Sequence, residues 1–359
     1  MHPIDAPSSD VTVVIPTTDR PDFLRTALQS VAAQSARPRI RRVLISENRT
    51  PARTRSVAGE FSRELPIDFV SHTTPLPPLE HLFYLMDNLE QDGSMAMLHD
   101  DDWWMPHHLE SALARIGTGC GPSSTYSGYL EARSESSPFG CGSNLMLWFG
   151  AGFPDTRHDW NLPKTDMILA SLWGTPVRYS TLVAHTDSIR RIMPALRRAN
   201  PFDNDRLLGV CLAAVGNLTY SPTPSVCIRL HPGQDTHRYD ALEQSQNFSQ
   251  TTHHLLDMLD DPSGFVLLLA DRLTNCPDHS IHQILPLLAE PWCYGPLLGR
   301  GLLPKDIQAL VLPYVPKKPN FFYHLGRLLP PILKDWIARA RSKSGKPSRR
   351  PPKSQPTPS

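Results

Sequence analysis

Short apolar runs and longer segments with helical spacing alternate along the first hundred residues of the chain. Residues 11–15 (VTVVI), 42–46 (RVLIS) and 67–70 (IDFV) are short and rich in apolar and β-branched side chains, which predicts strands. After Pro21, apolar residues recur every three or four positions as far as Val31, which predicts a helix. This alternation of strand and helix predicts an α/β fold with a mostly parallel sheet and helices on both faces.

The loop between the first strand and the first helix contains residues that end or begin elements. Pro16 ends the strand, and Pro21 suits the first turn of a helix because its missing N–H would have no partner there. Thr17, Thr18 and Asp19 carry side-chain oxygens of the kind that cap helices. We therefore expect one of these three side chains to cap the helix.

The remaining elements follow from weaker patterns. We expect a helix over 79–89, strands over 94–98, 178–184, 218–220 and 226–230, and a helix over 205–214. Beyond residue 239 the chain reads as helical segments broken by proline, and from 342 Ser, Lys, Arg and Pro predict disorder. We divide the chain into an N-terminal extension (1–10), a catalytic domain (11–238), a mainly helical region (239–340) and a disordered basic tail (341–359).

Three consecutive aspartates follow the apolar strand predicted at 94–98, in the sequence His99-Asp100-Asp101-Asp102. In open α/β sheets ligands bind beyond the carboxyl ends of the strands, which is where these acids are expected. Adjacent carboxylates repel one another unless a cation neutralises them, and Mg²⁺ or Mn²⁺ is commonly held by one or two carboxylates together with substrate phosphates. The alternative is a solvated acidic turn before a helix that begins near Pro106.

Composition excludes several classes of protein. The sequence contains no run of about 18 apolar residues, the length needed to span a bilayer, and its acidic N-terminus does not resemble a signal peptide. A cytoplasmic location is therefore expected. The net charge of +1 argues against a nucleic-acid partner. Six scattered cysteines without a CxxC pair predict reduced, mostly buried thiols.

Positive charge is concentrated near the C-terminus. Residues 317–353 contain eleven Lys or Arg and a single acid, Asp335, next to the large apolar groups of 321–340. This combination is typical of a segment that lies on an anionic membrane, so we expect peripheral contact through 321–353 at the inner face of the cell membrane. The alternative is an amphipathic helix packed on the catalytic domain, followed by a polar tail.

Four segments, in order, resemble the signatures of family 2 glycosyltransferases. They are VVIPTTDRPDFLRTALQSVAAQS, VLISENRT, MLHDDDWWMPHHLE and PFDNDRLLGVCLAAVGNLTYSPTPSVCIRLHPGQDT, and together they span 11–236, about two thirds of the chain. The resemblance implies the GT-A fold, a divalent cation (Mn²⁺ or Mg²⁺) and a nucleoside diphosphate sugar as donor. It also implies inverting transfer to a hydroxyl of a saccharide or lipid-linked acceptor, in the synthesis of a surface polysaccharide, glycolipid or other glycoconjugate.

The resemblance also assigns roles to individual residues. Asp205 matches the second acid of the family's acidic pair, which implies a general base; Asn204 replaces the first acid, and Asp203 could serve if the alignment shifts by two. Asp205 could equally cap the helix that follows it. The residues implied at the donor are Pro16, Thr17, Arg20, Glu47, Asp100 and Asp101, and those implied at the metal are Asp102 and His231.

Two other functions remain open at this point. A nucleotidyltransferase would share an α/β nucleotide site and acidic metal ligands, but the loop Ile15-Pro16-Thr17-Thr18 lacks the glycines expected around a phosphate. A non-catalytic binder of nucleotide sugars could keep the fold, and Asn204 and Glu47 depart from the family's usual residues. Against this second alternative, clustered charge is costly to keep where it has no function.

Overall fold

The computed structural model describes residues 10–49, 51–117, 123–132, 140–142, 159–172, 175–199, 204–231, 241–274, 285–286 and 288–315. The chain divides into two compact units, Met1–Val315 and Pro316–Ser359, and every described residue belongs to the first. The predicted tail and the predicted membrane segment 321–353 therefore lie outside the described residues. The division into a catalytic domain and a helical region stays a prediction.

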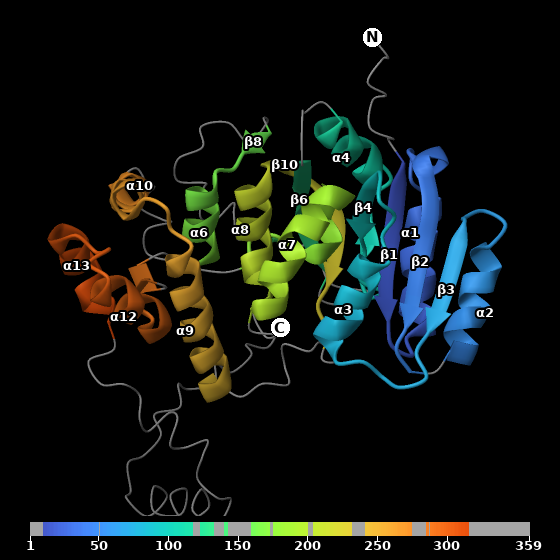
Figure 1. Cartoon of the computed structure of the whole chain (residues 1–359), viewed down its shortest axis with the longest axis horizontal. Coiled ribbons are helices and arrows are strands. Elements are labelled where there is room, and N and C mark those ends of the chain that lie inside the picture. The colour runs from blue at the N-terminus through green and yellow to red at the C-terminus, as the bar shows by residue number, and fades with distance from the viewer. Residues whose placement is uncertain are drawn as a thin grey trace, which may run out of the picture. The chain divides into compact units, whose positions relative to one another are not determined.

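One sheet organises the described chain, with the strand order β3-β2-β1-β4-β9-β6-β10-β5 (Figure 1). The strands are β1 (Val11–Thr17), β2 (Ile40–Glu47), β3 (Ile67–Ser71), β4 (Ser94–Met97), β5 (Trp103–Trp104), β6 (Ser123–Ala132), β7 (Gly140–Gly142), β8 (Trp160–Asn161), β9 (Leu182–His185) and β10 (Asn217–Arg229). Strands β1 to β4 pair in parallel, as the sequence predicts, so their carboxyl ends meet at one edge.

The second half of the sheet departs from the sequence prediction. Strand β9 pairs antiparallel with both β4 and β6, and it begins only at Leu182, because Tyr179–Thr181 form the 3₁₀ turn η2 instead of the strand predicted from 178. Since β9 runs opposite to β4, its first residue lies level with the last residues of β4. Turn η2 is thereby placed next to the three aspartates.

Strand β10 is one long strand rather than the two short strands predicted at 218–220 and 226–230. It pairs in parallel with β6, and its register shifts twice between Ser221 and Val226, around Pro222 and Pro224. Prolines have no N–H to donate, so the ladder is interrupted there without ending the strand. A glycine, Gly128, faces this irregularity, where a Cβ atom would lie 2.8 Å from the carbonyl oxygen of Pro222.

Helices cover both faces of the sheet, as predicted. Helices α1 (Pro21–Ala32), α2 (Pro51–Phe61) and α4 (His108–Ile116) share one apolar core with Val13 and Ile15 of β1. Helices α3 (Pro78–Asp87), α6 (Lys164–Ser171), α7 (Thr186–Arg198) and α8 (Asn204–Val215) share the opposite core with Val14. Alternate residues of β1 thus enter opposite cores, as the period of a strand requires.

The C-terminal helices predicted beyond residue 239 are present as α9 (Ala241–Asp257), α10 (Pro262–Thr274), α12 (Pro291–Gly299) and α13 (Lys305–Val311), followed by the turn η5 (Leu312–Tyr314). Arg206 joins them to α8. Its buried guanidinium donates from Nε to the carbonyl of Ser171 at 2.8 Å and lies 5.2 Å from the ring centre of Phe248 in α9 and 5.3 Å from that of Trp292 in α12.

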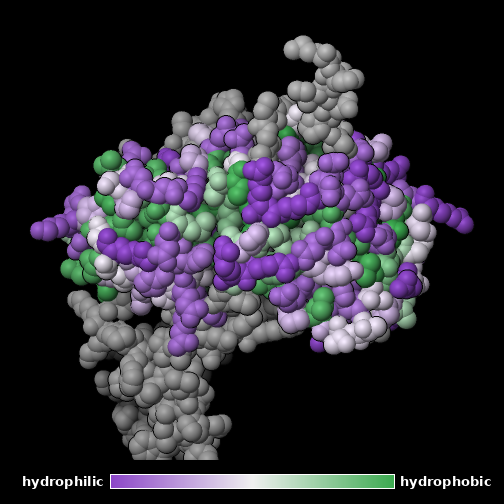
Figure 2. Space-filling model, in the orientation of Figure 1, coloured by the Kyte–Doolittle hydropathy of each residue, from purple (hydrophilic) through white to green (hydrophobic). Residues whose placement is uncertain are grey.

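The surface of this region carries both polar and apolar side chains (Figure 2). Leu267 of α10 and Leu312 of η5 are among its exposed apolar side chains. None of the helices among the described residues combines the length and the apolar character needed to cross a bilayer. Cys211, Cys227 and Cys293 are buried free thiols, as predicted for cysteines.

Two buried histidines make the stability of the fold sensitive to acid. Burial lowers the pKa of His81 to about 4 and that of His108 to about 3, from an ordinary value of 6.5. Nδ1 of His108 lies 2.8 Å from the hydroxyl of Ser225, which itself donates to Ser127, so Nδ1 carries the proton. The buried Nε2 has no partner, and a proton added there would place an unpaired charge in the core.

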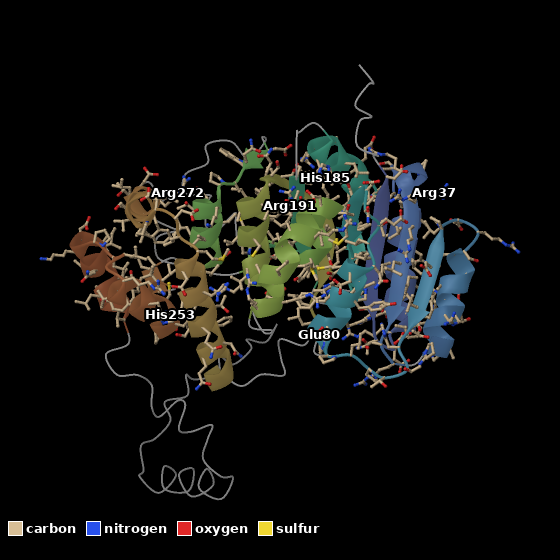
Figure 3. The ribbon with its side chains drawn as sticks, viewed as in Figure 1. Arg37, Glu80, His185, Arg191, His253 and Arg272 are labelled. Atoms are coloured by element: carbon tan, nitrogen blue, oxygen red, sulfur yellow. The ribbon has the colours of Figure 1, made fainter. Side chains whose placement is uncertain are left out.

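We expect these histidines to stabilise the folded chain above pH 6.5 and to destabilise it as the pH falls from 6.5 towards 4 and 3. In that range the two histidines bind protons in the unfolded chain but not in the folded chain. The free energy of unfolding therefore falls by about 1.4 kcal/mol per pH unit for each histidine. Urea unfolding between pH 5 and 7 should show a smaller decline with acid for His108→Gln than for the wild type. The exposed His253 (Figure 3) provides the control, and an equal change of slope in His253→Gln would contradict this assignment.

Candidate functional site

The candidate site lies where the carboxyl ends of β1, β2 and β4 meet. Thr17, the last residue of β1, pairs with Glu47, the last residue of β2. Strand β4 aligns Met97 with Val14, so the chain that leaves β4 brings Asp100 level with Thr17. The hydroxyl of Thr17 donates to Oδ2 of Asp100 at 2.7 Å. The parallel register thus brings together residues that are 83 positions apart in sequence.

Asp100 is buried and has several donors around it. In addition to Thr17, the backbone of Thr18 hydrogen-bonds with it, and Nη1 of Arg20 lies 3.3 Å from Oδ1. Burial raises the pKa of Asp100 to about 7, helped by the neighbouring charge of Asp101 and opposed by Arg20 and the hydrogen bonds. Any further positive charge in the site would therefore favour the ionised form of this carboxylate.

Glu47 shapes the loop after β1 from a fully buried position. Its carboxylate accepts the N–H of Asp19 at 3.1 Å and the N–H of Arg49 at 2.8 Å. Asp19 has a positive φ of 51°, which non-glycine residues adopt only when neighbouring contacts hold them there. The donor contact predicted for Glu47 stays a prediction, and the geometry gives it a second role in holding this loop.

The predicted helix cap is absent. The N-cap position of α1 is Arg20, whose side chain makes no capping hydrogen bond. The hydroxyl of Thr17 is bound to Asp100, and the backbone of Asp19 is bound to Glu47. The Thr17 hydroxyl has therefore been recruited to the site, and the loop residues Thr18 and Asp19 are held there through their backbone. Pro16, which the sequence predicted to end the strand, lies inside β1: it pairs with Ser46 in the sheet and is half-buried, and the strand continues to Thr17.

Asp101 lies at the centre of a group of cationic or ionisable side chains. Its Oδ2 is 3.2 Å from Nη1 of Arg20 and 2.9 Å from Nε2 of His231. Burial acts to raise the pKa of Asp101, but His99, His231 and Arg20 together hold that pKa below its ordinary value. An ionised carboxylate and an imidazole thus meet from the segments that follow β4 and β10.

Asp102 is buried, and both of its carboxylate oxygens have protein partners. Its Oδ2 accepts the hydroxyl of Ser180 at 2.6 Å, and its Oδ1 accepts the N–H of Arg229 at 3.0 Å. Burial, together with the charge of Asp101, raises the pKa of Asp102 to about 8. This side chain ties the end of β10 to turn η2. The metal contact predicted for it stays a prediction.

Arg229 is a residue that the sequence patterns did not single out. Its Nε donates to the carbonyl of Asp101 at 3.1 Å, and its guanidinium lies 4.7 Å from the ring centre of Phe23 and 5.0 Å from that of Trp103. Phe23 also packs against His231, with ring centres 5.3 Å apart. These contacts hold His231 beside the acids. Its only sequence signal was its place two residues before His231 in the fourth of the family-like segments.

The candidate base, Asp205, lies in the first turn of α8 with 31% of its side chain exposed. Its Oδ2 is 3.9 Å from Nη1 of Arg178. Asn204, which replaces an acid of the family pattern, is buried: its Oδ1 accepts the hydroxyl of Tyr179 at 2.6 Å, and its Nδ2 donates to the carbonyl of Leu196 at 2.9 Å. Asn204 therefore fixes the start of α8. Asp203 lies outside the described residues.

The described residues form no group of three or more His, Cys, Asp or Glu side chains with the geometry of a metal site. The Asp101 and His231 pair supplies two ligands, one oxygen and one nitrogen. Magnesium and manganese are commonly held by one or two protein ligands together with substrate phosphates. The site thus fits a cation whose coordination a bound diphosphate completes.

Comparison with known proteins gives a consistent result. Residues 12–121 match the family model for glycosyl transferase family 2. A comparison with curated protein sequences gives no significant match.

Solved structures with a similar fold include Staphylococcus aureus TarS 1-349 in complex with UDP-GlcNAc (TM-score 0.54, 14% identity, 84% of each chain covered) and the same protein in complex with UDP (TM-score 0.51, 13% identity, 84% of this chain and 83% of that chain). They also include S. aureus TarS (TM-score 0.53, 13% identity), where the alignment covers 84% of this chain and spans half the length of that chain. The resemblance to family 2 glycosyltransferases is therefore confirmed over residues 12–121, and the described chain has the GT-A fold.

Proposed function

We propose that this protein is a glycosyltransferase that moves a sugar from a nucleoside diphosphate sugar to an acceptor hydroxyl. One observation carries the proposal: Thr17, Arg20, Asp100, Asp101 and His231 converge at the carboxyl ends of parallel strands, in a chain that matches glycosyl transferase family 2 over 12–121. Ligands of open α/β sheets bind at this edge. The UDP and UDP-GlcNAc complexes of TarS support a uridine nucleotide as the first donor class to test.

Residues of the β1 and β2 ends are proposed to hold the nucleotide. Thr17 and Arg20 face Asp100 and Asp101 from the loop that Glu47 holds in place. Arg20 now neutralises the two aspartates, and a guanidinium in this position can instead pair with phosphate oxygens through two parallel hydrogen bonds. We propose that donor binding redistributes these contacts, with Arg20 turning from the carboxylates to the diphosphate.

A divalent cation fits the same place. We propose Asp101 and His231 as the residues that hold Mn²⁺ or Mg²⁺, because they face each other at 2.9 Å whereas both oxygens of Asp102 are bound by Ser180 and Arg229. When bound, the cation would stabilise negative charge on the departing diphosphate. The raised pKa values of Asp100 and Asp102 agree with a cluster that a cation would help to ionise.

Asp205 is proposed as the general base. Its carboxylate is partly exposed at the start of α8, so it can accept the proton of an acceptor hydroxyl. The acceptor oxygen then attacks the anomeric carbon as the bond from that carbon to the diphosphate breaks. Attack from the side opposite the leaving group inverts the configuration. Holding the two substrates in line supplies part of the rate enhancement.

We further propose a catalytic domain that ends at residue 238, and an acceptor from surface polysaccharide, glycolipid or other glycoconjugate synthesis. We also propose that the protein has no nucleic-acid partner and a cytoplasmic location, with peripheral membrane contact through 321–353. The membrane segment lies outside the described residues.

Calorimetric titration of UDP, GDP and dTDP into the full chain, with and without manganese, tests the proposed donor site. We expect one nucleotide to bind and manganese to strengthen its binding, because the diphosphate completes the coordination of the cation. Failure of all three nucleotides to bind in the presence of manganese would contradict the proposal. Tight nucleotide binding that manganese does not change would support the proposed donor site and contradict the proposed metal in it.

A further inference from the structure

The segment Arg178–Tyr179–Ser180, which precedes β9, contacts both the aspartates that follow β4 and the start of α8, where Asp205 lies. Ser180 donates to Asp102 at 2.6 Å, Tyr179 donates to Asn204 at 2.6 Å, and Arg178 lies 3.9 Å from Asp205. Three consecutive residues thus contact the aspartate cluster on one side and the start of α8 on the other. None of the sequence motifs includes this segment.

The backbone of the segment is held at several points. The carbonyl of Arg178 accepts both the N–H of Thr181 at 2.9 Å and its hydroxyl at 2.7 Å. The carbonyl of Ser180 accepts the indole N–H of Trp104 at 2.8 Å, and the hydroxyl oxygen of Ser180 accepts the N–H of His99 at 3.1 Å. Position 178 is therefore fixed relative to both His99 and Asp102.

The side chain of Arg178 is directed by its neighbours as well. Tyr129 of β6 hydrogen-bonds with it, and the Tyr129 side chain is itself buried. About a third of the Arg178 side chain is exposed, as is about a third of Asp205. At 3.9 Å from Oδ2, Nη1 is beyond hydrogen-bond distance, so this contact is an ion pair. A cation at this distance can orient a carboxylate without donating a hydrogen bond to it.

We infer that Arg178 is a positioning residue for the transfer reaction, which orients the Asp205 carboxylate from the segment that also holds Asp102. The inference deepens the proposed function and rests on it. Asp205 is on α8, whereas the acids of the donor site follow β4, so a fixed distance between base and donor requires a connection between these elements. The segment Arg178–Tyr179–Ser180 supplies that connection, because Tyr179 also holds the first residue of α8 through Asn204.

Kinetics of four single variants and one double variant test this inference in the full chain with its donor and manganese. Arg178→Gln should lower kcat by about 10- to 100-fold, the range expected when a catalytic group is misplaced by about an ångström, with the donor KM within about 2-fold of the wild type. Arg178→Lys, which keeps a cation near Asp205, should restore most of kcat. Arg178→Gln should add little to Asp205→Asn, because the two residues act as a unit. Arg191→Gln, an exposed arginine of α7 paired with Asp187 (Figure 3), is the control.

If Arg178→Gln does not fold, Tyr129→Phe takes its place in the same scheme, since the Tyr129 change removes only the hydroxyl that hydrogen-bonds with the Arg178 guanidinium. The inference fails if kcat is unchanged, if the loss appears only in the donor KM, or if the Arg178→Gln effect is undiminished in Asp205→Asn. A wild type that turns over no donor at all would overturn the proposed function, and the inference with it. An active wild type with an unaffected Arg178→Gln would overturn the inference alone.

Discussion

Replacing Asp205 by Asn is expected to lower turnover of the donor by about 10²- to 10⁴-fold, the usual contribution of a general base. Asparagine has nearly the same shape as aspartate but cannot take the acceptor proton. The nucleotide site is formed by the ends of β1, β2 and β4, whereas Asp205 is on α8, so UDP binding should remain within about 2-fold of the wild type. Steady-state release of UDP, together with calorimetry of UDP, measures both quantities.

The control for this variant is Asp187→Asn. Asp187 is an exposed aspartate of α7 whose partner is Arg191, and its replacement should change neither turnover nor UDP binding. Equal turnover by Asp205→Asn and the wild type would remove Asp205 from the mechanism. In that event Asp203→Asn is the variant to measure next, since Asp203 takes the place of the base if the family alignment shifts by two. Asp203 lies outside the described residues.

Replacing Asp101 by Asn is expected to remove most of the strengthening that manganese gives to UDP binding. Even residues behind a metal ligand change metal affinity by about 10- to 100-fold, so loss of a direct ligand should weaken manganese-dependent binding by more than about 100-fold. The Asp102→Asn change should cost less than about 10-fold, since Asp102 is turned towards Ser180 and Arg229. Calorimetry of UDP at several manganese concentrations separates the two variants.

A larger loss of manganese-dependent UDP binding in Asp102→Asn than in Asp101→Asn would indicate that Asp102 binds the metal, as the family resemblance implies. That result would contradict the assignment to Asp101. His231→Gln provides a second test, because His231 shares the proposed ligand pair with Asp101 at 2.9 Å. It should weaken manganese-dependent binding while UDP binding without metal is retained. Loss of binding in both conditions would indicate that His231 contacts the nucleotide rather than the cation.

The parallel half of the fold could be predicted because its signals are local. Residues 11–15, 42–46 and 67–70 are rich in apolar side chains over the length of a strand, and the helical spacing after Pro21 lies between two of them. The antiparallel insertion of β9 and the single strand β10 depend on pairing between distant segments. No pattern in residues 178–184 specifies that the first part forms a turn, because that outcome is set by Trp104, His99 and Asp102.

The site could be located from the sequence, but the directions of its side chains could not. Three consecutive aspartates have nearly equal chances of facing a ligand, and the structure separates them through partners far away in sequence: Thr17 for Asp100, His231 for Asp101 and Ser180 for Asp102. The expected cap of α1 fails for the same reason. The hydroxyl of Thr17 is bound by Asp100, and the backbone of Asp19 by Glu47, which are residues far away in sequence.

Asn204 shows what a departure from a family pattern can mean physically. The sequence alone suggests that the chain has lost an acid of a catalytic pair. The structure buries this amide, where it accepts from Tyr179 and donates to the carbonyl of Leu196. A carboxylate could not donate to that carbonyl, so asparagine suits the position and Asp205 remains partly exposed beside it.

The central claim is transfer chemistry, and donor turnover by the purified full chain tests it most directly. The protein is incubated with manganese and each common UDP-, GDP- or dTDP-sugar, with and without a mixture of saccharide acceptors, and the nucleotides are followed by chromatography. The account predicts that one donor is consumed faster with the wild type than with Asp205→Asn, with release of its nucleoside diphosphate. Nucleotide binding without consumption of any donor above the rate in buffer would contradict the account and indicate a non-catalytic binder of nucleotide sugars.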